Sequence, residues 1–310
     1  MGGPYRPAAF ILGAGASMPY GFPSGPALVD EIISSLRTAD NQDQVALLFE
    51  PEFDRAHRWE FAWALMGSQR TSIDTFLEGN KAFIEIGKRA IAYCLIQDEQ
   101  PESVLRCERA EQWYKYFFNT FLLKSSPDRF DENKLLVITL NYDRSFEFAL
   151  ASAIKHSYGM SDKDAEQAMK RGVTILHLHG DLGSLFHLDR GSNEQRDFDR
   201  SLTPETIRVA QNRIRVVHDD SPDTLASYDA ANKALKNYEI ACFLGFSYNE
   251  LTLRRLRMGL PKILWGTTYG LVQNDYPRIA SGLGRSLNWQ FAGRCLEFVQ
   301  SAQWFDPSQG

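Results

Sequence analysis

The chain has 310 residues and a formal net charge of -5, with 44% hydrophobic and 24% charged residues. This length is enough for one large or two modest domains, and the composition is ordinary for a globular protein. The acidic balance disfavours a general nucleic-acid-binding protein, because such proteins normally carry a basic excess. No stretch approaches the roughly 18 consecutive apolar residues of a membrane span, so we expect no membrane contact.

The cysteines and the amino-terminal residues indicate the cellular compartment in which the protein is expected. Cys94, Cys107, Cys242 and Cys295 are far apart and form no Cys-x-x-Cys pair. This spacing argues against a structural zinc site and against a disulfide framework, so we expect buried free thiols and no metal. The first residues lack the apolar core of a signal peptide, and we therefore expect a cytoplasmic protein.

The first predicted strand runs from Ala8 to Leu12. The residues that follow it are Gly13-Ala14-Gly15-Ala16-Ser17. A strand that runs into Gly-x-Gly is the beginning of a dinucleotide-binding loop, because glycines let backbone N–H groups approach a diphosphate and the next helix N-terminus attracts its charge. Met18 stands where the full fingerprint has a third glycine, so a simple tight turn remains an alternative.

A long helical region follows this first unit. From about residue 41 to residue 131 the apolar spacing is helical and no clear strand is visible. We therefore expect a helical module of residues 41–131, inserted into a Rossmann-like domain of residues 8–40 and 132–300. Ser72 or Thr71 is a plausible N-cap for a helix within this module. The aromatic residues of the module suit core or homo-oligomer contacts.

The most informative stretch runs from Leu135 to Ile154. Its first six residues are almost all apolar, which is typical of a strand buried on both faces of a parallel sheet. From Phe146 onward, the apolar residues recur with helical spacing. Asn141 and Asp143 lie between the strand and the helix. Open α/β sheets bind ligands just outside the carboxyl ends of their strands, so these residues are candidates for chemistry.

Two further predicted strands end in the same manner. Residues 173–178 run into His179, and residues 239–245 run into the segment Gly245-Phe246-Ser247. On a regular strand, His177 and His179 would face the same side. A parallel sheet would bring all four of these strand ends to one edge. A fifth strand, without site residues, is expected at 261–266, after a helix at 250–258. The tail from residue 278 has mixed helix and strand signals.

These segments, in this order and spacing, resemble the sirtuin fold family. They more closely resemble the bacterial sirtuin-like NAD hydrolases of antiphage defence systems, and the segment from Ser72 to Leu77 also resembles that branch. The resemblance implies an α/β fold of the sirtuin and deoxyhypusine-synthase kind. Such a fold has a Rossmann-like parallel sheet with helices on both faces, here with an inserted helical module. It further implies NAD as a substrate, cleaved between nicotinamide and ribose to give ADP-ribose.

The resemblance also assigns roles to individual residues. Asn141 and His179 match the catalytic Asn and His of the family, and Asp143 matches the acidic residue at the nicotinamide end. An amide can orient a water or a ribose hydroxyl without a change of charge, and a histidine can accept a proton near neutrality. The residues matched to diphosphate, ribose and adenosine binding are Gly13, Ala14, Gly15, Ser17, Gly245 and Ser247.

Two departures from the protein-deacylating sirtuins favour plain hydrolysis of NAD. Their zinc-binding cysteine pairs have no counterpart here, and Phe22-Pro23-Ser24-Gly25 stands where they carry Asp-Phe-Arg. Unchecked loss of NAD would kill the host cell. The resemblance therefore implies an assembly with a partner protein, an ATPase or a nuclease that senses phage, and the aromatic residues of the helical module suit a homo-oligomer.

Two other functions remain open from the sequence. His177-Leu178-His179-Gly180-Asp181 has the His-x-His-x-Asp spacing of binuclear metallohydrolases, although Leu182 stands where the full motif has another histidine. The fold could also bind NAD or ADP-ribose as a sensor or structural subunit, without turnover. Individual site residues have structural alternatives as well: Asp143 as a helix cap, Asn141 as a turn residue and His179 as a core histidine.

Overall fold

A computed structural model describes residues 7–37, 42–106, 111–123, 126–185, 194–216, 221–287 and 289–301. Within these ranges, six parallel strands form one sheet in the order β3-β2-β1-β4-β5-β6. The strands are β1 (Ala8–Leu12), β2 (Leu135–Thr139), β3 (Val173–His177), β4 (Ile240–Leu244), β5 (Ile263–Thr267) and β6 (Trp289–Phe291). This is the order of a doubly wound fold whose direction reverses between β1 and β4. The predicted α/β fold with a parallel sheet is confirmed.

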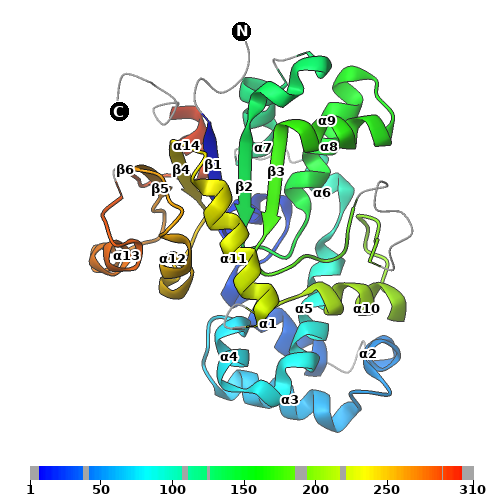
Figure 1. Ribbon diagram of the computed structural model, residues 1–310. Helices are drawn as coiled ribbons and strands as arrows, with labels where there is room; N and C mark the ends of the chain where they lie inside the picture. Colours follow the sequence, from blue (N-terminus) through cyan, green and yellow to red (C-terminus); the bar gives the residue numbers. More distant parts are fainter. Residues whose placement is uncertain are drawn as a thin grey trace.

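Helices cover both faces of the sheet, as Figure 1 shows. The helices of the described residues are α1 (Gly25–Arg37), α2 (Gln42–Phe49), α3 (Arg55–Gly67), α4 (Ile73–Gly79), α5 (Ile84–Asp98), α6 (Pro101–Leu105), α7 (Trp113–Phe117), α8 (Ser145–Tyr158), α9 (Asp162–Gly172), α10 (Pro204–Arg213), α11 (Pro222–Leu235), α12 (Glu250–Leu256), α13 (Asp275–Leu283) and α14 (Cys295–Ser301). Helices α11, α12 and α13 pack on one face, and α7, α8 and α14 on the other.

The central strands are buried because both of their faces are apolar. Every residue of β1, β2 and β4 is buried. Alternate side chains enter two separate cores, so that Phe10 and Val137 lie on the α7 and α8 side while Ile11 and Ile138 lie on the α11 side. A strand that is apolar at every position can satisfy both cores at once, which explains the continuous apolar runs in the sequence.

The helical region lies beyond the carboxyl ends of the strands. In Figure 1, α2, α3 and α4 gather below the arrowheads of β2 and β3. Helix α7 behaves differently, because it packs directly on the sheet: the Phe117 ring lies 4.8 Å from that of Phe10, and Trp113 Nε1 donates to the Ala16 carbonyl at 2.8 Å. The division into residues 8–40 with 132–300 and residues 41–131 stays a prediction, and α7 joins the two parts.

The structure gives the outcome for the predicted helix cap, the carboxyl-terminal tail and the cysteines. The predicted N-cap of α4 is Ser72, whose hydroxyl accepts from the Thr75 N–H. The tail contains α13, β6 and α14. Cys94, Cys242 and Cys295 are buried free thiols, and Cys107 lies outside the described residues. Among the described helices, none combines the length and the apolar character that crossing a membrane requires.

Candidate active site at the carboxyl ends of β1, β2 and β3

The loops after β1 and β4 are in direct backbone contact where the strand order reverses. The Gly15 N–H donates to the Gly245 carbonyl at 2.9 Å, and the Gly13 N–H donates to the Leu244 carbonyl at 3.0 Å. A Cβ at Gly13 would lie 2.6 Å from the Gly245 oxygen, and one at Gly245 would lie 2.2 Å from the Ala16 nitrogen. Only glycine allows this close approach.

The hydrogen bonding of the Gly-x-Gly loop limits what it can offer to a diphosphate. The amides of Gly13 and Gly15 are engaged as described, and those of Ala16 and Ser17 donate to carbonyls within the loop. Within the described part of the chain, the Ala14 N–H is the amide of this loop without a partner. A diphosphate here would meet that single donor and the bare Cα surfaces of the glycines.

Asn141, at the end of β2, is fixed by almost all of its polar atoms. Its N–H donates to Thr139 Oγ1 at 3.0 Å, and its carbonyl lies 3.1 Å from His177 Nδ1. Its Nδ2 donates to the Gly13 carbonyl at 3.0 Å and to Ser17 Oγ at 2.9 Å. Because a carbonyl only accepts, the Gly13 contact sets which side of the amide is nitrogen. Oδ1 has no hydrogen-bond partner among the described residues and stays available to a ligand.

Asp143 is buried beside the same loop. Its Oδ1 accepts from the Ser145 N–H at 3.0 Å and from the Ser145 hydroxyl, and the Ser17 hydroxyl is also within hydrogen-bonding reach. Burial raises the pKa of the Asp143 carboxyl, and the two serine hydroxyls work against that rise. The bond to the Ser145 amide gives Asp143 a structural role just before α8. It is not the helix cap that the sequence left open, because the N-cap of α8 is Arg144 and no side chain caps it.

A cavity of about 120 Å³ adjoins Asn141 and Asp143. A dry cavity of about 150 Å³ holds one benzene-sized ring, so this one suits a single ring and not a whole dinucleotide. Its walls come from the loop after β1, the start of α1, α4, α5 and the end of β2: Ala14, Ser17, Phe22, Pro23, Ser24, Gly25, Leu28, Ser72, Ile73, Asp74, Leu95, Leu140, Asn141, Tyr142 and Asp143.

The predicted site residues divide between this cavity and its surroundings. Ala14, Ser17, Asn141 and Asp143 line the cavity. The other predicted residues do not line it. Gly13 and Gly15 lie in the loop after β1, and Gly245 contacts them from the loop after β4. Ser247 is exposed in the loop after β4, and His179 is buried just after β3.

The sequence placed Tyr142 between Asn141 and Asp143 but gave no role to it or to Asp74. Tyr142 is buried and its hydroxyl lies 2.7 Å from Asp74 Oδ1 on α4 and 3.2 Å from the Arg215 carbonyl. This hydroxyl ties the helical region to the end of β2 and to the segment after α10. The available signal was the segment from Ser72 to Leu77, which the sequence predicted as a helix start without a role for Asp74.

The two histidines at the end of β3 face different helices. A shared side was expected only for a regular strand, and this condition is not met, because β3 ends at His177 and the chain then turns. His177 Nε2 lies 2.9 Å from Glu147 Oε1 on α8, whereas His179 Nε2 lies 2.9 Å from the Tyr228 hydroxyl on α11. His179 is 1% exposed, and its carbonyl accepts from the Arg215 N–H at 2.8 Å.

The three residues of the His-x-His-x-Asp motif do not converge on one point. His177 pairs with Glu147 and His179 with Tyr228, while Asp181 forms an ion pair with Arg213. Burial works against the charge of Asp181, but Arg213 outweighs it and lowers the pKa of Asp181 to about 2. In the part of the chain that the structure describes, no group of three or more His, Cys, Asp or Glu side chains could hold a metal ion.

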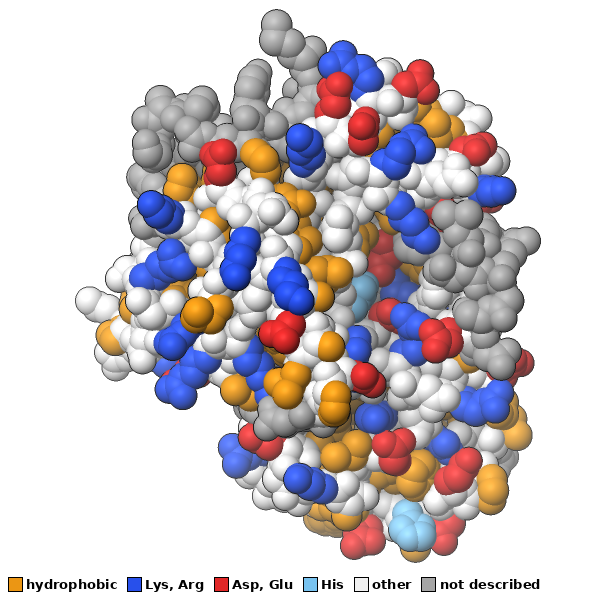
Figure 2. Space-filling view, viewed as in Figure 1, with side chains coloured by type: hydrophobic (Ala, Val, Ile, Leu, Met, Phe, Trp, Pro, Cys, Tyr) orange, Lys and Arg blue, Asp and Glu red, His pale blue; other side chains and the backbone are white. Residues whose placement is uncertain are grey.

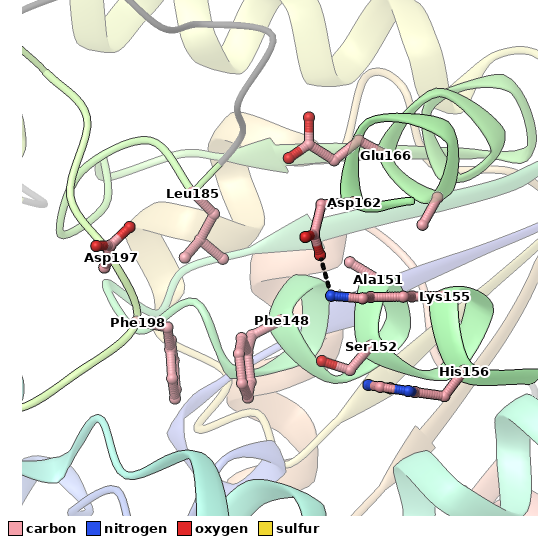
Figure 3. A pocket seen from close by; sticks show the side chains of 11 residues that line it. Phe148, Ala151, Ser152, Lys155, His156, Asp162, Glu166, Leu185, Asp197 and Phe198 are labelled. Carbon is pink, nitrogen blue, oxygen red and sulfur yellow. Dashed lines mark ion pairs between the residues drawn. The ribbon is translucent and has the colours of Figure 1, made fainter. Parts of the chain in front are cut away.

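A larger cavity of about 250 Å³ lies elsewhere, between α8, α9 and residues 185 and 197–198. Figure 3 shows Lys155 paired with Asp162 in this cavity, at 2.7 Å, and the Phe148 ring beside that of Phe198. None of the predicted site residues lines it. Size alone therefore does not select the candidate site.

The face in Figure 2 carries lysine and arginine side chains mixed with aspartate and glutamate side chains. Lysine and arginine side chains are visible over α11 and α12 in this view. Arg254 there pairs with Glu250 on its own helix, an arrangement typical of solvated helix surfaces.

Residues 135–262 match the family described as SIR2-like domain. The match covers less than half of the chain, from the first residue of β2 to the residue before β5. It includes Asn141, Asp143, His179, Gly245 and Ser247 and leaves out the loop after β1. Among curated proteins, none matches this chain.

Solved sirtuin structures are distantly similar. A Sir2 structure with the inhibitor EX-527, 2′-O-acetyl-ADP-ribose and a deacetylated p53 peptide has 13% identity and a TM-score of 0.38, covering 96% of this chain and 92% of its own. A Sir2 variant with a deacetylated p53 peptide and 3′-O-acetyl-ADP-ribose has 15% identity and a TM-score of 0.40 at the same coverage. A structure described as the structural basis of sirtuin substrate affinity has 16% identity and a TM-score of 0.37, covering 98% and 95%.

Proposed function

We propose that this protein hydrolyses NAD at the nicotinamide–ribose bond and releases nicotinamide and ADP-ribose. The match to a SIR2-like domain points to NAD-binding or NAD-consuming chemistry. The observation that carries the finer proposal is Asn141, whose polar atoms are all bonded within the protein except Oδ1. Asn141 lines a cavity sized for one ring.

The nicotinamide ring would occupy this cavity. Phe22, Leu28 and Leu95 provide apolar walls, and the Asp143 carboxyl can accept a hydrogen bond from the carboxamide of the ring. Since the cavity is too small for the whole dinucleotide, the rest of NAD would lie outside it, across the reversal point of the sheet. The diphosphate would lie near Ala14 and the adenosine near the exposed Ser247.

The chemistry is a displacement at the anomeric carbon of the ribose. The oxygen of a water molecule bonds to this carbon while the carbon–nitrogen bond breaks, and the bonding electron pair neutralises the nicotinamide nitrogen. The ribose carries positive charge in between, as in other glycosyl transfers. Asn141 Oδ1 accepts a hydrogen bond from the water or from a ribose hydroxyl and so orients it. The resemblance assigns the proton that the water loses to His179, which lies at the neighbouring strand end with its ring buried outside the cavity.

Incubation of the purified protein with NAD, followed by chromatographic separation of the products, tests this proposal. We expect nicotinamide and ADP-ribose in equal amounts. Asn141→Ala and His179→Ala should each lower turnover by roughly 100-fold or more, the usual contribution of a group that orients or accepts a proton. His156→Ala is a matched control, because His156 is an exposed histidine on α8.

The outcomes separate the candidate functions. A correctly folded Asn141→Ala or His179→Ala that retains full turnover would remove that residue from the chemistry. Tight binding of NAD without any cleavage would favour the alternative of an NAD or ADP-ribose sensor.

We further propose that this activity serves as the toxic effector of an antiphage defence system. In a host bacterium, the wild type should deplete NAD and reduce phage plaques after infection, whereas Asn141→Ala should do neither. Light scattering of the purified protein would test the proposed homo-oligomer. Co-purification from infected cells would test the proposed ATPase or nuclease partner. Equal protection by the inactive variant would contradict the effector role.

A further inference from the structure

A partly buried histidine beside the site has no role in the chemistry above. His177 is the last residue of β3, and its side chain is 11% exposed. Its Nδ1 lies 3.1 Å from the backbone carbonyl oxygen of Asn141, and its Nε2 lies 2.9 Å from Glu147 Oε1. Both nitrogens therefore have defined partners, one of them in the residue proposed to orient the water.

These partners determine the protonation of the imidazole. A carbonyl oxygen and a carboxylate oxygen only accept hydrogen bonds. A neutral imidazole has one N–H, so it would turn a nitrogen lone pair toward one of the two oxygens. Both contacts are satisfied only when both nitrogens carry a proton, which makes the ring an imidazolium.

The surrounding charges favour that form. Burial alone would lower the pKa of His177, but Glu147 outweighs it, with a further contribution from Asp181, and raises the pKa to about 9. The charges that face the ring come from three elements. Glu147 lies on α8, Asp181 follows β3 and is paired with Arg213 of α10, and Arg215 Nη2 lies 3.4 Å from the His177 carbonyl.

We propose that His177 is a positioning residue, which holds Asn141 in place by donating a hydrogen bond from Nδ1 to its backbone carbonyl. Glu147 keeps the ring doubly protonated, so that the Nδ1 proton is always present. This inference rests on the proposed hydrolysis of NAD. The bond to the carbonyl completes the set that fixes Asn141 at its N–H, carbonyl and Nδ2, leaving Oδ1 for the reacting molecule.

Two conservative variants of His177 distinguish the positioning of Asn141 from a purely structural ion pair between His177 and Glu147. In His177→Asn, the shorter amide can still donate to the Asn141 carbonyl but does not reach Glu147. In His177→Gln, the longer amide reaches Glu147 but leaves the Asn141 carbonyl. We expect kcat to fall about 10-fold or more in the Gln variant and about threefold in the Asn variant, with KM within about twofold in both.

Nuclear magnetic resonance of the wild type provides a measurement that needs no variant. With ¹⁵N-labelled histidine, both ring nitrogens of His177 should carry protons at pH 7, and the ring should titrate near pH 9. A neutral ring at pH 7, or equal losses of kcat in the two variants of an active protein, overturns the positioning role. A wild type that leaves NAD intact overturns the proposed hydrolysis, whatever the protonation of His177.

Discussion

His177 and His179 are two residues apart, yet the fold gives them opposite surroundings. His177 faces α8 and lies between a carboxylate and a carbonyl. His179 faces α11 and meets the hydroxyl of Tyr228, a group that can either donate or accept. The first ring has to be charged, while the second can be neutral and so accept a proton. The partners, and not the residue type, decide which histidine can act as a base.

The turn after β3 produces this difference. Gly180 has a φ of +76°, and the Arg213 carbonyl occupies the place where a side chain would begin. Two residues after Arg213, the Arg215 N–H donates a hydrogen bond to the His179 carbonyl. The end of α10 therefore fixes the turn that sends the two imidazoles to different faces of the sheet.

The largest effect is expected from Gly180→Ala, which attacks the turn itself. A Cβ there would lie 1.7 Å from the Arg213 oxygen, so left-handed strain and overpacking should add to about 3–5 kcal/mol of lost stability. Gly159→Ala is the matched control, since Gly159 also has a positive φ, of +64°, but faces open space, and it should cost about 1 kcal/mol. Urea unfolding measures both. Equal losses in the two variants would show that the Arg213 contact is unimportant.

A medium effect is expected from Glu147→Gln, which removes the charge that holds His177 protonated. Because the pKa of His177 is raised, its stabilisation is complete below pH 6.5 and is lost as the pH rises through about 9. The rise from 6.5 to about 9 corresponds to about 3 kcal/mol. The stability difference between wild type and Glu147→Gln, measured by urea unfolding, should therefore narrow between pH 6 and pH 9.5. A constant difference across this range would contradict a charged His177.

The smallest effect is expected from Tyr228→Phe, which removes the hydroxyl beside His179 and keeps the ring. One hydrogen bond is worth about 1 kcal/mol, so kcat for NAD should fall about fivefold. Tyr238→Phe is the control, because Tyr238 packs against the same apolar cluster and should leave kcat unchanged. If both variants keep full activity, the Tyr228 hydroxyl does not orient His179.

The fold was largely predictable because it depends on local patterns. The run from Ala8 to Leu12 is apolar at every position and ends at a glycine, and β1 has the same bounds. The same pattern located β2 to β5 within one or two residues at each end. By contrast, β6 has three residues, from Trp289 to Phe291, which is too short for a period to be recognised.

The site was predictable only where it follows a strand. Asn141 and Asp143 come directly after β2, and both line the cavity. Arg215 and Tyr228 belong to a connection and a helix that carry no motif, and Asp74 lies in a segment whose resemblance gave it no role. All three reach the strand ends through tertiary packing. The side on which His179 lies depends on a turn that packs against Arg213, far along the chain, so alternation along the strand does not extend to His179.

The contact between Gly13, Gly15 and Gly245 has a consequence for how this protein can vary. Two loops from distant parts of the gene touch through main-chain atoms only. Any one of these three positions can therefore accept a side chain only if the opposite loop retreats at the same time. Single substitutions at the three glycines should be rejected in a random library even when every surrounding position tolerates them.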